Sequence, residues 1–101
     1  MEQEFVDNVL RGLGKELEQN PRKIWMFLSF ADNDGFKGGA IVKAHGIIDA
    51  SLTTHRMKIN PGGQMACNPI PDRELPPEEY RNRLLTKKDL DEIWPDDVVV
   101  N

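Results

Sequence analysis

Residues 24–31 have the sequence Ile-Trp-Met-Phe-Leu-Ser-Phe-Ala, and the predicted fold is built outward from this stretch. It is short, rich in aromatic side chains and bounded by turn residues, which is the pattern of a β-strand. Because its apolar character is nearly continuous, we expect a central strand that is covered on both faces. Asp32-Asn33-Asp34-Gly35 provides turn chemistry, and residues 36–44 supply a second strand. The two stretches together predict a β-hairpin.

We predict a helix before the hairpin, over residues 4–19. Apolar residues recur there at four-residue intervals, as on the buried stripe of an amphipathic helix: Phe5, Val9, Leu13 and Leu17. The helix should end at Asn20-Pro21, since the residue before a proline is pushed out of the α region. Gly12 and Gly14 weaken its middle. We interpret them as a site of close packing or a partial break, with a hinge as the alternative.

The stretch after the hairpin, residues 47–57, fits two interpretations. Its apolar residues fit a helical stripe: Ile47, Ile48 and Leu52. Asp49 lies in the first turn, where a negative charge complements the helix dipole. Thr53-Thr54 instead favours a third strand. We expect the helix and keep the strand as the alternative.

The C-terminal part of the chain is predicted from turn and capping residues. Asn60-Pro61-Gly62-Gly63 requires a turn, and residues 64–68 fit a short third strand. Pro77 followed by two glutamates predicts a helix that runs to about Leu85. A further short helix is expected over residues 87–93, preceded by a capping box of Thr86 and Asp89.

The predicted class is therefore α+β: an N-terminal helix, a β-hairpin, a covering helix, a short third strand and a C-terminal helical segment. A chain of 101 residues corresponds to one domain, residues 1–101. The hairpin needs a helix to cover its apolar face. We expect the core to consist of Trp25, Phe27, Phe30, Ile41, Val42, Ile48 and Leu52.

Composition excludes several classes of protein. Seventeen acidic residues against thirteen basic ones give a net charge of −4, which disfavours binding to duplex nucleic acid. A single cysteine, Cys67, excludes a disulfide-stapled scaffold. The longest mostly apolar stretch, residues 24–31, is far shorter than the roughly 20 residues of a membrane helix, and no signal peptide is visible. We expect a cytoplasmic protein without a membrane partner.

The middle of the chain resembles small bacterial proteins of unknown function. The resemblance runs from about Trp25 to Leu85 and is carried by an aromatic strand, Asp34-Gly35-Phe36, the strand Gly38-Gly39-Ala40-Ile41-Val42, a helix and the Asn60–Gly63 turn. These motifs are mainly turn chemistry. The resemblance implies a small α+β fold and carries over no functional residues.

Catalysis and metal binding find little support in the sequence. The soft-metal ligands His45, His55 and Cys67 are ten and twelve residues apart, whereas structural zinc sites pair ligands two to five residues apart. We expect no metal and no cofactor. Ser51 and His55 share a helix face, and Cys67 with His55 is an alternative pair, but neither has an evident orienting group. A small enzyme that uses His55 or Cys67 is therefore our third hypothesis, and we name no catalytic residue.

Two binding hypotheses rank higher. A small-ligand or anion site would use the backbone N–H groups of Gly62 and Gly63, with Asn60 and His55 nearby. The leading hypothesis is a non-catalytic protein-interaction or accessory module. Its predicted contact surface lies in the last third of the chain: Tyr80, Trp94, Val98, Val99 and Val100. The Val98–Val100 tail is β-prone, so we also expect a homodimer formed by strand addition.

Overall fold

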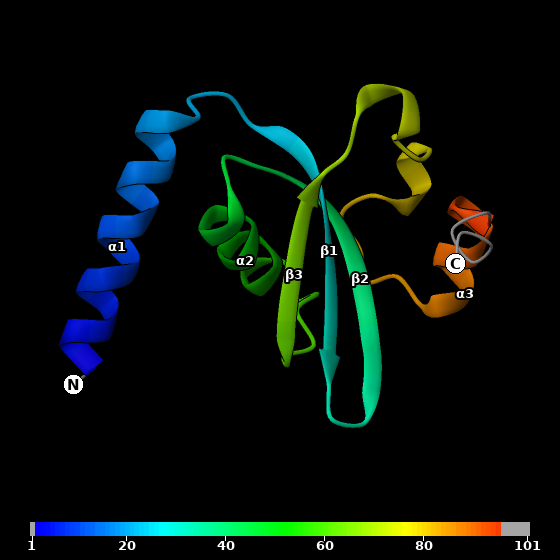
Figure 1. Ribbon diagram of the computed structural model, residues 1–101, viewed down its shortest axis with the longest axis horizontal. Coiled ribbons are helices and arrows are strands. Elements are labelled where there is room, and N and C mark those ends of the chain that lie inside the picture. The colour runs from blue at the N-terminus through cyan, green and yellow to red at the C-terminus, as the bar shows by residue number, and fades with distance from the viewer. Residues whose placement is uncertain (1, 96–101) are drawn as a thin grey trace.

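The computed structural model describes residues 2–95, apart from the side chains at positions 2, 3 and 5. It contains helix α1 (Glu2–Gln19), strands β1 (Ile24–Asp32) and β2 (Gly35–Ala44), helix α2 (Ile47–Arg56), strand β3 (Gln64–Pro69) and helix α3 (Lys87–Ile93). Single 3-10 turns at Asp72–Glu74 and Glu78–Tyr80 precede α3. The α+β class and the predicted order of helices and strands are confirmed (Figure 1).

The three strands form one antiparallel sheet in the order β2-β1-β3. The aromatic strand β1 is central, as its continuous apolar character predicted. Figure 1 shows α2 on one side of the sheet and the chain that follows β3 on the other, with α1 outermost beyond α2. In the rest of the text, the side covered by α2 is termed the helix face and the opposite side the C-terminal face.

Residues 47–56, whose sequence is compatible with a helix or a strand, form helix α2. The contacts of its first and last turns explain this outcome. The Glu16 carboxylate of α1 accepts the N–H groups of Ile48 and Asp49 at 2.6 and 3.1 Å, which satisfies donors that a helix start leaves open. The two threonines are accommodated because their hydroxyls donate to helix carbonyls, Thr53 to Asp49 and Thr54 to Ser51. A contact from another helix therefore supports what local propensity left undecided.

The helix face holds the densest part of the core. Alternate residues of β1, Met26, Leu28 and Phe30, point to this face and are 7% exposed or less. They pack with small and branched residues of β2 and α2: Ala40, Val42, Ala44 and Ala50. The alanines allow the backbone of α2 to lie close to the sheet.

The C-terminal face is covered without a long helix. Phe27 lies opposite Ile41 in the β1–β2 ladder, and Leu85 from the segment before α3 is fully buried beside them. Leu85 exchanges backbone hydrogen bonds with Gly39 at 2.8 and 2.9 Å. An added Cβ at Gly39 would lie 2.9 Å from the Phe27 ring, so glycine permits this close approach.

The helix predicted from Pro77 to about Leu85 is wrong. Only Glu78–Tyr80 forms a 3-10 turn, and the chain then extends along the outer edge of β2. Asn82 donates to the carbonyl of Ile41 at 2.8 Å, and Leu85 pairs with Gly39. These hydrogen bonds satisfy backbone groups on the outer edge of β2, and the side chain of Leu85 is buried at the same time. Together, the bonds and the burial stabilise the extended chain more than the local signal at Pro77 favours a helix. The α3 prediction is confirmed, including the reciprocal capping box of Thr86 and Asp89.

The predicted core is partly wrong, because the segments that cover the sheet leave some of the predicted residues partly exposed. Phe30, Ile41 and Val42 are fully buried, as expected. The other predicted core residues remain partly exposed: Trp25, Phe27, Ile48 and Leu52. The β1 residues among them point to the C-terminal face, which is less completely covered, and the α2 residues lie at a groove beside α1.

Candidate functional site

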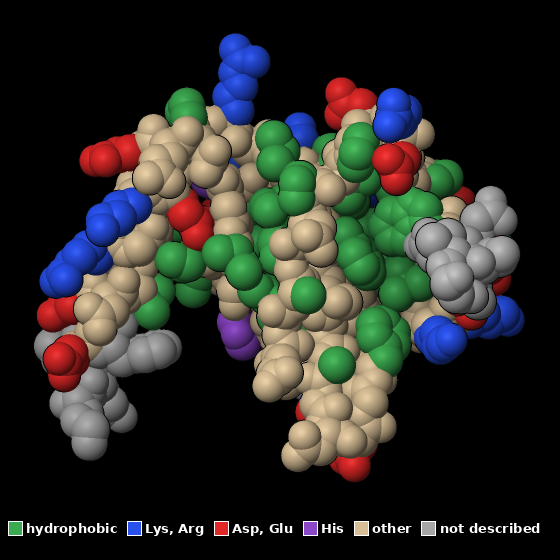
Figure 2. All heavy atoms as spheres, viewed as in Figure 1, with side chains coloured by type: hydrophobic (Ala, Val, Ile, Leu, Met, Phe, Trp, Pro, Cys, Tyr) green, Lys and Arg blue, Asp and Glu red, His purple; other side chains and the backbone are tan. Residues whose placement is uncertain are grey.

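An apolar groove opens between α1 and α2 and is bounded on its far side by β3. Its volume is about 460 Å³, and it is lined by Val9, Ile47, Ile48, Ser51, Leu52, His55 and Met65. In the following text, this set of residues is termed the α1–α2 groove. Figure 2 shows hydrophobic side chains gathered in the hollow between the ridge of α1 and the sheet. An apolar concavity with a few polar groups is the usual form of a binding site.

The position of α1 is fixed by close contacts with the start of α2. An added Cβ at Gly12 would lie 2.6 Å from Cδ1 of Ile48, so glycine allows the two helices to approach. An added Cβ at Gly46 would lie 2.7 Å from the Glu16 carboxylate, which bonds the first turn of α2. The helix α1 is continuous through its glycines, in agreement with the close-packing interpretation at Gly12.

A second apolar stripe on α1 is open to solvent. Val6, Leu10 and Leu17 are 46%, 59% and 43% exposed. By helical periodicity they share one side of α1, away from the Gly12 and Glu16 side that meets α2. Ile47, at the lip of the groove, is 48% exposed. The groove and this stripe together make α1 and α2 an apolar surface that the described chain does not cover.

Ser51 and His55 lie together in the groove, as the four-residue spacing predicted. Within residues 2–95 no hydrogen bond joins the two side chains, and no carboxylate orients the imidazole. A nucleophile and base need both features. Both side chains offer hydrogen-bonding groups at the wall of the apolar groove.

Cys67 is placed as a structural thiol. Its Sγ contacts Sδ of Met26 at 3.9 Å on the helix face. Burial raises the pKa of the thiol to about 11, and the negative charge of Glu16 adds to the effect. A thiol with this pKa is protonated at neutral pH and is a poor nucleophile.

The Asn60–Gly63 turn is bonded within the chain. Asn60 accepts the N–H of Gly62 at 2.9 Å and donates to Thr54 Oγ1 at 3.0 Å. At Gly63 an added Cβ would lie 2.5 Å from the carbonyl oxygen of Ala31, which marks close packing against the end of β1. The anion site predicted here therefore loses the Gly62 donor, and His55 lies in the α1–α2 groove instead. The ligand-binding prediction itself stays a prediction.

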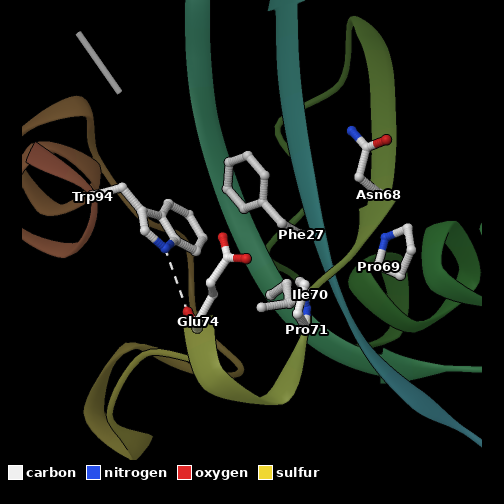
Figure 3. A pocket seen from close by; sticks show the side chains of 7 residues that line it. All are labelled: Phe27, Asn68, Pro69, Ile70, Pro71, Glu74 and Trp94. Carbon is white, nitrogen blue, oxygen red and sulfur yellow. Dashed lines mark hydrogen bonds between the residues drawn. The ribbon is translucent and has the colours of Figure 1, made fainter. Parts of the chain in front are cut away.

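Trp94, predicted as an interaction residue, packs on the C-terminal face (Figure 3). Its ring meets Phe27 edge-on, with 5.1 Å between centroids, and its Nε1 donates to the Glu74 carbonyl at 3.4 Å. The two rings border a shallow pocket of about 200 Å³ that is also lined by Asn68, Pro69, Ile70 and Pro71. Trp94 thus contributes to covering the sheet. The Val98–Val100 tail lies outside the described residues.

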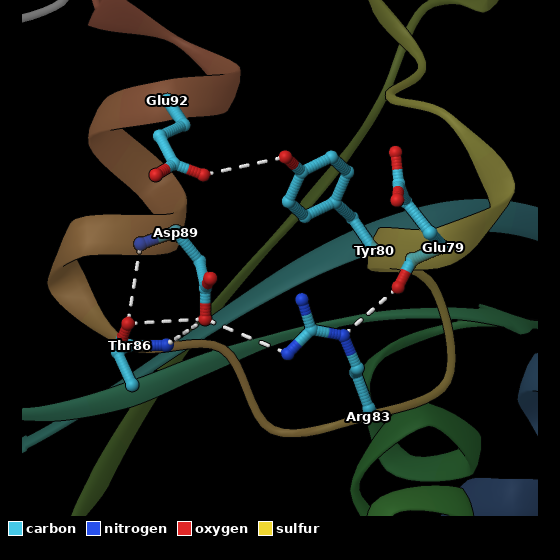
Figure 4. Close-up of polar contacts among 6 residues, drawn as sticks. All are labelled: Glu79, Tyr80, Arg83, Thr86, Asp89 and Glu92. Carbon is cyan, nitrogen blue, oxygen red and sulfur yellow. Dashed lines mark hydrogen bonds and ion pairs between the residues drawn. The ribbon is translucent and has the colours of Figure 1, made fainter.

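Tyr80, the other described residue of the predicted surface, belongs to a polar network with α3 (Figure 4). Its hydroxyl donates to Glu92 at 3.3 Å, and partial desolvation together with that carboxylate raises its pKa. Arg83 lies over the Tyr80 ring, donates to the Glu79 carbonyl and forms a 3.5 Å ion pair with Asp89. This arrangement is a hydrated face with internal ion pairs, which contribute little stability individually.

The α1–α2 groove was not predicted from the sequence. A signal was present, because Val6 and Leu10 widen the apolar stripe of α1 beyond what one helix–helix contact requires. Met65 gave no such signal, since only the pairing of β3 with β1 brings it beside α2. A groove made from three separated segments is visible only after the chain has folded.

Comparison with known proteins gives no assignment: no family model matches the chain, and neither a curated protein nor a solved structure matches it significantly. Over residues 2–95, no helix is both long and apolar enough to cross a membrane. In the same part of the chain, no three His, Cys, Asp or Glu side chains are placed to hold a metal ion.

Proposed function

We propose that this chain is a non-catalytic protein-interaction module whose α1–α2 groove binds the apolar face of an amphipathic helix from another protein. The observation that supports this proposal is the groove itself, an apolar concavity continued by exposed apolar residues on both helices. Ile47 at its lip and Leu10 on α1 are large apolar side chains that remain about half exposed. Surfaces of this kind are typical of protein contacts.

The shape of the groove favours a helix as the occupant. Its walls are two helices, and its apolar residues follow the helical spacing of α2, with Ile48 and Leu52 one turn apart. An amphipathic helix binds such a groove through apolar residues at positions i, i+3 or i+4, and i+7. Each buried anchor of Leu or Phe size contributes roughly 1.5–3 kcal/mol before the costs of association.

Charge defines the chemistry of this partner further. Arg56 and Lys58 are exposed at the end of α2 where His55 lines the groove. The acidic groups at the other end, Glu16 and Asp49, bond backbone N–H groups of this chain. We therefore expect the partner helix to carry acidic residues beside its apolar face at the His55 end.

A peptide-display selection tests the proposal. The intact chain is used to select from a random peptide library, and the selected peptides are then measured against two variants, Ile47→Glu and Ile24→Glu. The two isoleucines are both 48% exposed, but only Ile47 lines the groove, so Ile24 is a matched control.

We expect the selected peptides to carry apolar residues at helical spacing. Their affinity for Ile47→Glu should be at least tenfold lower than for the unmodified chain, and their affinity for Ile24→Glu should be unchanged. Peptides that bind both variants equally well, or a selection without any binder, would refute the groove as the contact surface. Peptides whose binding is lost with Ile24→Glu instead would move the contact to the pocket at the start of β1 that Ile24 lines with Trp25 and Lys43.

A further inference from the structure

The two edges of the sheet differ in whether another segment of the described chain pairs with them. The outer edge of β2 is occupied by residues 82–85, through the bonds of Asn82 to Ile41 and of Leu85 to Gly39. The outer edge of β3 has no strand partner among residues 2–95. An unpaired strand edge presents N–H and C=O groups that bind readily to a further strand.

The hydrogen-bond pattern identifies which groups of β3 are open. Ile70 donates to the carbonyl of Trp25, in register with the pairing of Asn68 with Phe27 and of Ala66 with Ser29. The backbone groups of even-numbered residues therefore face β1, and those of odd-numbered residues face outward. Pro69, which has no N–H, falls at an outward position, where proline is tolerated on an edge strand. The outward N–H groups are those of Met65 and Cys67.

The side chains of β3 lack the usual protection against edge pairing. Residues 64–69 contain no charged residue, although the chain as a whole is 30% charged. Natural edge strands are commonly guarded by lysines, inward charges or bulges. Here Gln64, Ala66 and Asn68 are exposed and neutral, and Ala66 at the centre of the strand is small.

We propose that β3 pairs antiparallel with β3 of a second copy of this chain, about a two-fold axis at Ala66, to give one continuous sheet across the dimer. In this register Met65 and Cys67 of one copy exchange backbone hydrogen bonds with Cys67 and Met65 of the other. A strand pairs with its own copy in this way only where like residues tolerate each other. Neutral residues around a central alanine meet that condition.

The same register explains why a second copy fits better than a charged peptide. With a net charge of −4 on each chain, two copies repel each other generally, and the neutral strand is where they approach without like-charge contacts. The paired strands are short, so the interface is small. We expect a weak dimer with a dissociation constant on the order of 10–1,000 µM.

This self-association uses backbone groups of the β3 edge, whereas the α1–α2 groove uses side chains, among them that of Met65. Ala66 does not line the groove, so substitutions at Ala66 test the dimer separately from the proposed function. The test uses Ala66→Glu and Ala66→Lys, each analysed alone and mixed, by sedimentation equilibrium. At the two-fold axis, each variant places two like-charged side chains directly opposite each other, on Cβ atoms about 4.5–5.5 Å apart. Gln19→Glu adds a negative charge at the exposed end of α1 and is the charge-matched control.

Each Ala66 variant alone should weaken dimerisation at least about fivefold, and an equal mixture should restore it, because opposite charges then face each other. Gln19→Glu should dimerise like the unmodified chain. Rescue by mixing also shows that the variants fold. A chain that stays monomeric at about 1 mM, or dimers unaffected by both Ala66 variants, would overturn the proposal.

Hydrogen exchange gives a second readout. The amides of Met65 and Cys67 should become protected as concentration rises, while those of Ala66 and Asn68, bonded to β1, should be protected at every concentration. Protection of Met65 and Cys67 that does not depend on concentration would place a segment of the same chain on this edge and would also overturn the proposal.

Discussion

The two faces of the sheet are covered in different ways. On the helix face, α2 follows β2 directly and packs on Met26, Leu28 and Phe30 with almost no exposed surface. On the C-terminal face, residues 70–95 cross the sheet with little regular structure and leave Phe27 partly exposed. The helix face is closed by many small contacts, and the C-terminal face depends on a few anchors, above all Leu85.

This difference predicts how stability is distributed. In a densely packed core, truncation of a side chain leaves a cavity that the neighbouring residues cannot fill. Each such substitution therefore lowers the free energy of unfolding strongly. A segment held by a few anchors opens locally, at less than the free energy of global unfolding. The comparison is therefore testable by substitutions of similar chemistry on the two faces.

Phe30→Ala should have the largest effect. Phe30 is 1% exposed on the helix face, so its loss should lower the free energy of unfolding by about 3–5 kcal/mol. The same change at Phe27, which is partly exposed on the C-terminal face, should cost clearly less. Urea denaturation of both variants measures the difference. Equal costs would show that the two faces are equally well packed.

Leu85→Ala should come next, with a loss of about 2–4 kcal/mol. The side chain is fully buried, but its segment is an extended piece of chain that can detach from β2. We expect faster proteolytic cleavage within residues 70–84 and unchanged hydrogen exchange in α2. If α2 loses protection to the same extent, the C-terminal face is not a separate unit.

Thr86→Ala should cost about 1 kcal/mol, because it removes the oxygen that accepts the Asp89 N–H at 3.1 Å in the capping box. The change should be confined to α3 and the Tyr80 network, and the hydrogen-exchange protection of α2 should not change. Thr86→Ser is the control, since it keeps the capping oxygen. A loss as large for serine as for alanine would exclude capping as the cause.

The titration of Cys67 should have the smallest effect at neutral pH, and its contribution should appear only at high pH. Its pKa is raised to about 11 in the folded chain by burial, against an ordinary value of 9.0. Between those two values the unfolded chain has lost the proton and the folded chain retains it, so stability falls as pH rises through this range. Below pH 9 the thiol has no such effect.

The measurement is urea denaturation at pH 8 and pH 10 of the unmodified chain and of Cys67→Ala, which lacks this titration. The difference between the two chains should shrink at pH 10. At pH 7, alkylation by iodoacetamide should be roughly 100-fold slower than for a thiol of ordinary pKa. Rapid labelling at pH 7 would show that the edge of β3 opens readily and that the thiol is not shielded.

Local signals in the sequence were sufficient for much of the fold. The apolar run of β1 predicted a central strand, and the Thr86–Asp89 pair predicted both the start of α3 and its capping box. These features depend on hydrogen bonds and side-chain alternation within a few residues, so the sequence alone carries them. The same is true of the two β-strands that flank the Asp32–Gly35 turn.

Tertiary structure decided the rest, because the deciding contacts join residues far apart in the chain. Glu16 bonds the first turn of α2, and the open edge of β2 draws residues 82–85 into pairing where a helix was expected. Which β1 side chains are fully buried depended on which segment covers each face. The α1–α2 groove arises because α1 packs on the start of α2 through Gly12, which leaves the side chains of Ile47, Val6 and Leu10 about half exposed. Residue spacing specifies the face of a helix or strand, and only the folded chain determines what that face meets.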